Sequence, residues 1–394
     1  MNASSRAKPY QGPALLSCGF RPFFLLGSGW AALSVALWLP LFEGEIALPT
    51  LFAPRDWHVH EMLFGYIAAV LTGFLLTAIP NWTGRLPLQG FSLLFLVIVW
   101  VAGRIAIWCS VYVGGLVGAI VDCSFLAVLV AAVAREIIAG KNWRSLKVLI
   151  PVSILALANV GFHAEANIRG SSAYALRTSV AAILILIMLI GGRIVPSFTR
   201  NWLARENPGR LPVPFGSFDM AALTFSAGAL CLWVVMPDGA LTGAALCGAS
   251  LLQLVRLARW TGERTTREWL VLVLHIAYAF VPLGFLLAGL AAFGLVLPSA
   301  GVHAWMAGAA GTMTLAVMTR ASLGHTGQAL VAGAGTQLIY AAVVIGAVAR
   351  VGGALVPEWG LVLVHVAALA WIAAFGGFAL LYAPLLIRTG LGRE

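Results

Sequence analysis

Two histidines and a glutamate stand at the head of a long apolar segment, where residues 57–66 read WHVHEMLFGY. Imidazole nitrogens bind haem iron and copper. A carboxylate can orient a metal-bound histidine by accepting a hydrogen bond from its second ring nitrogen. His58 and Glu61 are three residues apart and share one helix face. We therefore expect Glu61 to support a metal-bound histidine or to relay protons.

His58 and His60 cannot both face one metal ion from a regular helix. Successive residues are rotated by about 100°, which places the two imidazoles about 200° apart. Either the first residues of the segment are unwound, which Pro54 permits, or the two histidines have different partners. The sequence leaves both alternatives open.

The chain has seven histidines, and most are expected toward one face of a membrane. Those expected on the outer side are His58, His60, His163, His303 and His365, and those expected toward the inner side are His275 and His325. Polar groups at membrane depth are costly and usually face a cavity or a partner. We expect His58, His60 and His303 to bind metal, with His163, His275 and His325 as further cofactor ligands. Packing or hydrogen bonding is the alternative for each, and the better one for His365.

Four charged residues are expected inside or close to the same segments. Asp122 falls near the middle of its segment, where insertion costs about 2.5–3.5 kcal/mol, so it needs a partner or a role in proton relay. Arg104 and Arg177 lie toward outer ends, at the depth of haem carboxylates or of Glu165. Extension of either arginine to the interface is the alternative.

The elements that carry these residues are membrane helices. Hydrophobic residues make up 61% of the 394 residues and charged residues only 10%, against about 25% charged in soluble domains. A span takes about 20 apolar residues. The twelve predicted spans are 23–42, 58–79, 91–109, 111–134, 146–166, 173–195, 217–236, 240–258, 269–293, 301–319, 329–349 and 359–387. We predict an all-α polytopic membrane protein.

The net charge of +10 is explained by topology. With the N-terminus inside, most Lys and Arg residues fall on the inner side, as the positive-inside rule requires. Both termini are then cytoplasmic, and no nucleic-acid partner is expected. Because the loops are short, residues 1–394 are predicted to form a single transmembrane domain in contact with the lipid bilayer. The longest inner loop is expected near 196–216, between two sets of six spans.

A weak internal repeat accompanies the spans. The second span ends with AIPNWTGR (78–85), the sixth with IVPSFTRN (194–201), and the tenth with VMTRASLGHTG (317–327). A period of four helices indicates three four-helix units. Alternatively, Pro and Arg merely mark helix ends at an inner interface.

The five cysteines have no CxxC spacing and indicate no disulfide framework. The absence of CxxCH excludes covalent c-type haem. Non-covalent b-type haem and copper are compatible with imidazole ligands, and helix packing without any cofactor is the alternative.

Long blocks of this sequence resemble the NnrS family. They are GFRPFFLLG (19–27), WHVHEMLFGYIAAVLTGFLLTAIPNWTGR (57–85), GGRIVPSFTRNWL (191–203) and HAWMAGAAGTMTLAVMTRASLGHTG (303–327). The resemblance implies a twelve-span protein of the bacterial inner membrane that contains haem and copper and acts in the response to nitric oxide and nitrosative stress. It also invites comparison with haem–copper oxidases, whose twelve spans form three arcs of four helices.

The leading hypothesis is therefore an inner-membrane haem and copper protein that binds or metabolises nitric oxide, which makes a redox metalloprotein conceivable. The alternative is a twelve-span transporter of copper or of a metal complex that uses the same histidines. The six-plus-six layout favours that alternative.

Overall fold

The computed structural model describes residues 10–388, which are helical with no strand among them. Eleven helices in this part of the chain are long and apolar enough to cross a membrane. The prediction of an all-helical polytopic membrane protein is confirmed at this level. Residues 1–9 and 389–394, for which a cytoplasmic position is predicted, lie outside the described residues.

The helical elements follow the predicted spans closely, because hydropathy sets where membrane helices lie. In chain order they are η2 (Ala14–Leu16), α1 (Phe20–Glu43), α2 (Pro54–His60), η3 (Glu61–Ile67), α3 (Ala68–Thr83), α4 (Phe91–Trp108), α5 (Ser110–Val113), α6 (Gly115–Ala139), η4 (Trp143–Ser145), α7 (Leu146–Arg169), α8 (Ala173–Leu186), η5 (Ile187–Gly191), α9 (Gly192–Glu206), α10 (Ser217–Val235), α11 (Ala240–Ala258), η6 (Gly262–Arg264), α12 (Trp269–Ala292), α13 (Pro298–His303), η7 (Ala304–Gly311), α14 (Thr312–His325), α15 (Ala334–Leu355), η8 (Pro357–Trp359) and α16 (Gly360–Ile387).

The tenth predicted span, 301–319, lies in the continuous helical run of α13, η7 and α14. This run is not among the eleven candidate spans, because Gly, Thr and His residues dilute its apolar character. The twelve-span count therefore stays a prediction.

Two predicted boundaries differ from the structure. The expected inner loop near 196–216 is shorter, because α9 continues through Pro196 to Glu206; membrane helices tolerate proline where neighbouring groups satisfy the freed backbone. The fourth span, predicted at 111–134, is broken at Gly114, whose φ of 86° is left-handed. Asp122 consequently lies about two turns from the start of α6, nearer the outer end than predicted.

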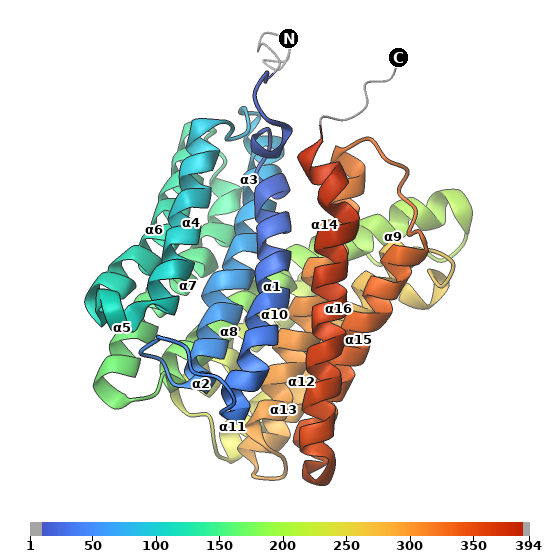
Figure 1. Ribbon diagram of the computed structural model, residues 1–394. Coiled ribbons are helices and arrows are strands. Elements are labelled where there is room, and N and C mark those ends of the chain that lie inside the picture. Colours follow the sequence, from blue (N-terminus) through green and yellow to red (C-terminus); the bar gives the residue numbers. More distant parts are fainter. Residues whose placement is uncertain (1–9, 389–394) are drawn as a thin grey trace. The chain divides into compact units, whose positions relative to one another are not determined.

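The described chain divides into two compact units. Among the described residues, unit 1 comprises 10–179, 318–329 and 375–388, and unit 2 comprises 180–317 and 330–374. In unit 1, α4 packs along α6, α6 along α7, and α1 along α3 (Figure 1). In unit 2, α11 packs along α12, which also contacts α13 and η7.

Three of the long helices contain a π-helical turn, namely η3, η5 and η7. Such turns add one residue to the helix and are frequent at functional sites. They also change the backbone hydrogen-bond pattern. Two carbonyl oxygens in these turns accept hydrogen bonds from side chains. Trp100 Nε1 donates to Gly65 O at 3.0 Å in η3, and Arg256 Nη1 donates to Met188 O at 3.1 Å in η5.

Arg21 joins the first turn of α1 to the last turn of α16 within unit 1. Its Nη1 donates to the carbonyl oxygens of Leu385, Leu386 and Arg388 at 3.2, 3.0 and 2.9 Å. A cation at the carboxyl end of a helix satisfies carbonyls that have no partner within the helix. The two ends of the described chain therefore lie at the same end of unit 1.

Replacing Arg21 by alanine should destabilise this junction. Arg21 is buried, and the variant leaves buried carbonyls without their donor, so we expect a loss of about 1–3 kcal/mol in the free energy of unfolding. The measurement is the midpoint of thermal unfolding of the detergent-purified protein. Arg55→Ala, which removes an exposed arginine, is the control and should unfold like the wild type. An equal midpoint for both variants would show that the junction contributes little.

Candidate functional site

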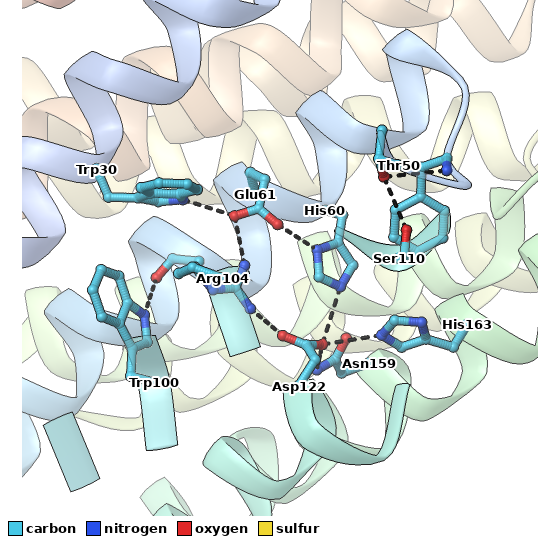
Figure 2. A network of polar contacts seen from close by, with 12 residues as sticks. Trp30, Thr50, His60, Glu61, Trp100, Arg104, Ser110, Asp122, Asn159 and His163 are labelled. Carbon is cyan, nitrogen blue, oxygen red and sulfur yellow. Dashed lines mark hydrogen bonds and ion pairs between the residues drawn. The ribbon is translucent and has the colours of Figure 1, made fainter. Parts of the chain in front are cut away.

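A polar cluster lies inside the apolar helices of unit 1 (Figure 2). Its members come from six helical elements: Trp30 of α1, His60 of α2, Glu61 of η3, Arg104 of α4, Asp122 of α6, and Asn159 and His163 of α7. We call this set the outer cluster, after the membrane side predicted for it.

Arg104 is the centre of the outer cluster. Its Nη1 donates to Glu61 Oε2 at 2.6 Å, and its Nη2 forms an ion pair with Asp122 Oδ1. The three side chains are 4%, 0% and 1% exposed. Removing one partner of such a buried pair typically costs about 3–5 kcal/mol, because the other charge stays buried. The pairing therefore fixes α4 against η3 and α6.

Asp122 offers its other oxygen to three nitrogens. Oδ2 lies 3.1 Å from His60 Nε2, 3.0 Å from His163 Nε2 and 2.8 Å from Asn159 Nδ2. One carboxylate is thus oriented on both sides, by a guanidinium on Oδ1 and by an amide on Oδ2. The two imidazoles converge on the same oxygen.

His60 stands between two carboxylates. Its Nδ1 lies 3.0 Å from Glu61 Oε1 and its Nε2 lies 3.1 Å from Asp122 Oδ2. A neutral imidazole carries one N–H and can donate to only one of these oxygens. Both contacts can be satisfied by a second proton on the His60 ring, by a proton on one of the carboxyl oxygens, or by a metal ion that Nε2 and Asp122 share.

The donor atoms of His60, Asp122 and His163 lie within 4.8 Å of one another. Two ligand atoms bound at about 2.0–2.2 Å to one metal ion lie about 2.8–3.6 Å apart, which includes the observed 3.0 and 3.1 Å to Asp122 Oδ2. The residues present therefore fit a transition-metal ion. Glu61 contacts His60 rather than the predicted His58, and its role beside a metal-bound histidine stays a prediction.

Aromatic rings enclose the two imidazoles. Phe52, in the segment before α2, lies 5.1 Å from the His60 ring and 5.5 Å from the His163 ring. Phe162 lies 5.3 Å from the His60 ring, and Phe64 lies 5.1 Å from it. An apolar surround excludes water and strengthens the electrostatic interactions inside it.

His58 is not a member of the outer cluster. Both histidines lie in α2, which is a regular α-helix, so the alternative of different partners holds. The His58 ring stacks on Trp38 of α1, with centroids 4.2 Å apart. The role of His58 as a metal ligand stays a prediction.

The other predicted site residues lie apart from this cluster or in unit 2. His325 packs its ring 5.4 Å from Phe20 in unit 1. Arg177 lies over the Tyr174 ring, with 4.7 Å from Cζ to the centroid. The sequence places Arg104 at the depth of haem carboxylates or of Glu165. In the structure it pairs with Glu61 and Asp122. Glu165 accepts hydrogen bonds from backbone nitrogens at the start of α8.

Two predicted histidines belong to unit 2. In His303, Nδ1 donates to Ser299 O at 2.7 Å within α13. His275 is buried in α12, with Nε2 2.8 Å from Thr199 Oγ1. The backbone of Gly262 closely covers the other nitrogen of His275, so that even a Cβ at Gly262 would clash with it.

Unit 2 has a buried network that the sequence reasoning missed. Arg256 pairs with Asp219 at 3.1 Å and donates to Tyr278 Oη at 2.8 Å, and Tyr278 donates to Gln253 at 2.7 Å. The Arg256 side chain is fully buried in α11. Asn159 of the outer cluster was missed as well. The sequence feature that could have pointed to Asn159 and Arg256 is a single polar residue within an apolar run.

The chain matches the model of the NnrS protein family over residues 14–389. A comparison with curated proteins gives no match. The matched range contains every member of the outer cluster.

Gly65 leaves the space that the outer cluster occupies, so Gly65→Ala should disrupt it. A Cβ there would lie 2.7 Å from Trp30 Nε1 and 2.9 Å from both Arg104 Nη1 and Glu61 Oε2. These atoms would have to separate, and we expect a loss of about 1–3 kcal/mol in unfolding free energy, measured by thermal unfolding. The control is Gly29→Ala, where a Cβ meets nothing within 4 Å. Equal stability of the two variants would contradict this account of Gly65.

Proposed function

Since the chain belongs to the NnrS protein family, we propose that it is a multi-pass protein of the bacterial inner membrane that binds or metabolises nitric oxide and protects against nitrosative stress. The observation that carries the proposal is the outer cluster, a set of two imidazoles, two carboxylates and one guanidinium inside apolar helices, of which only His163 is partly exposed. Buried ionisable groups in membrane segments mark functional sites. Nitric oxide is small and apolar, so it can reach such a site through the lipid.

Copper and b-type haem are the proposed cofactors. The donor set of the outer cluster suits copper, because imidazole is a normal copper ligand. A bound metal ion would supply an open coordination position for nitric oxide. In this arrangement Glu61 orients His60, while Arg104 and Asn159 orient Asp122.

Haem fits the described residues less well at His275 than elsewhere. Thr199 occupies one nitrogen of that ring and the Gly262 backbone covers the other, which leaves no approach for an iron atom. The proposal therefore keeps haem with the remaining predicted histidines, such as His58 and His303, rather than with His275.

The transporter alternative is not favoured by any feature of the outer cluster. A transit site must release its ion, which a site open to water on alternating sides can do. Here Arg104 pairs with both carboxylates and aromatic rings cover the imidazoles. These interactions suit a resident ion.

We also propose that residues 298–325 cross the membrane. They would be the tenth span in chain order and would bring the number of spans from eleven to twelve. The start of α1 and the end of α16 lie at one end of unit 1, joined by Arg21. A chain whose ends lie on one side of a membrane crosses it an even number of times. The eleven candidate spans therefore need one more, and the run from α13 to α14 is long enough to supply it.

The same helices support the proposal of three four-helix repeats. The π-helical turns η3, η5 and η7 lie in the second, sixth and tenth predicted spans, which are also the spans with the repeated exit motifs. In two of the three, a histidine directly precedes the π turn: His60 before η3 and His303 before η7. A period of four helices explains both features.

The purified protein should show a haem Soret band and contain copper, and nitric oxide should shift the Soret band. Optical spectroscopy with elemental analysis, before and after nitric oxide addition, makes the measurement. His58→Ala or His60→Ala should lower the haem or copper content while the protein still inserts. Purified protein without any Soret absorption and without copper would end this proposal.

The twelve-span topology predicts that reporters fused to the two ends of the chain both respond as cytoplasmic. Paired fusions of a reporter active only in the cytoplasm and one active only in the periplasm provide the measurement. A fusion within 326–333, after α14, should also be cytoplasmic, because the spans on either side alternate in direction. Opposite locations for the two ends would require an odd number of crossings.

A further inference from the structure

We infer that His60 Nε2, Asp122 Oδ2 and His163 Nε2 bind one divalent first-row transition-metal ion, Fe(II) or Cu(II). This inference deepens the proposed function, on which it rests for the role of the metal, by naming the ligands. It differs from the ligand set expected from the sequence, which contains no carboxylate and places His58 beside His60.

Charge balance is the first argument. Glu61 and Asp122 carry two negative charges, and Arg104 supplies one positive charge. With both imidazoles neutral, the outer cluster carries a net charge of −1, which a divalent ion with one bound hydroxide would neutralise. Uncompensated buried charge is costly, so the outer cluster needs a cation of its own.

Hydrogen-bond balance gives the same result independently. His60 faces a carboxylate oxygen from each ring nitrogen, and Asp122 Oδ2 faces two imidazole nitrogens. A metal ion in place of the protons between Asp122 and the two imidazoles gives Asp122 Oδ2 and both facing ring nitrogens a partner without a second proton on His60. His60 then keeps its hydrogen on Nδ1 for Glu61, in the carboxylate–histidine–metal arrangement that orients many metal-bound histidines.

An unsatisfied atom beside the proposed ion supports a bound ligand. Asn159 is 1% exposed, and its Oδ1 has no hydrogen-bond partner among the described residues. Its Nδ2 lies 2.8 Å from Asp122 Oδ2, at the edge of the site (Figure 2). Since buried polar atoms are nearly always paired, a water molecule bound to the ion is a suitable donor to Oδ1.

The donor set narrows the identity of the ion. Two imidazoles and one carboxylate with open positions are typical of non-haem Fe(II), and imidazole also suits Cu(II). Soft thiolate ligands are absent from the outer cluster, which disfavours Cu(I). Both candidates can accept nitric oxide at an open position, and their spectra distinguish them.

The test loads the metal-stripped, full-length protein in detergent with Cu(II), or with Fe(II) without oxygen. We expect about one tightly bound ion per chain. Paramagnetic resonance of the Cu(II) form should show coupling to imidazole nitrogens. The Fe(II) form should give the high-spin signal of an iron–nitrosyl when nitric oxide is added. These measurements need no variant, so they decide the inference even where a substitution prevents folding.

Variants then assign the ligands. Asp122→Asn and His163→Gln should bind the ion at least about 10-fold more weakly, and Glu61→Gln about 10–100-fold more weakly through the loss of orientation of His60. His365→Gln, which changes a histidine of α16 outside the outer cluster, is the matched control and should bind normally. Wild-type protein that binds neither ion, or bound Cu(II) without imidazole coupling, would overturn the inference.

The same samples separate this inference from the proposed function. If His60, Asp122 and His163 fail to bind either ion while the Soret band still responds to nitric oxide, the ligand assignment is wrong and the proposed function stands. If these three residues bind an ion in a protein that neither contains haem nor responds to nitric oxide, the ligand assignment stands and the proposed function is wrong.

Discussion

The bridging of Glu61 and Asp122 by Arg104 is the interaction on which the outer cluster depends. Three full charges can lie inside apolar helices only if each has a partner at contact distance, because burial of an unpaired ion costs far more than any single packing contact supplies. This requirement sets the relative rotation of α4, η3 and α6. Glycine makes the approach possible: a side chain at Gly103 would already press against the Asp122 backbone, with its Cβ 3.2 Å from Cα.

The histidines take their geometry from this framework. Asp122 is held on one oxygen by Arg104 and on the other by Asn159, so the position at which the imidazoles converge is fixed before any ion binds. The rings of Phe52 and Phe162 then pack against the His60 imidazole. Side chains that are ordered in advance lower the entropic cost of binding a ligand. The apolar rings also restrict access to molecules that can cross apolar surroundings, as nitric oxide can.

The sequence was sufficient to predict the helices but not how the cluster is paired. Hydropathy is a local property, so most of the predicted spans agree with the helices of the structure within a few residues. The break at Gly114, the extension of α9 and the later position of α15 were missed. The partners of Arg104 are 43 and 18 residues away, and rotation about each helix axis decides such contacts. Asn159 and Arg256 show the same difficulty, since a single polar residue in an apolar run reveals its depth but not its neighbour.

The π-helical turn η3 begins at Glu61, directly after His60, so the helix widens where two consecutive residues contact the outer cluster. Neighbours on an ordinary helix diverge by about 100°, and a π turn is equivalent to one additional residue in such a helix. One additional residue in a helix therefore rotates every later side chain relative to the earlier ones and changes which of them face the interior. Chemistry of this kind can therefore arise in an existing bundle without any change in the order of its helices.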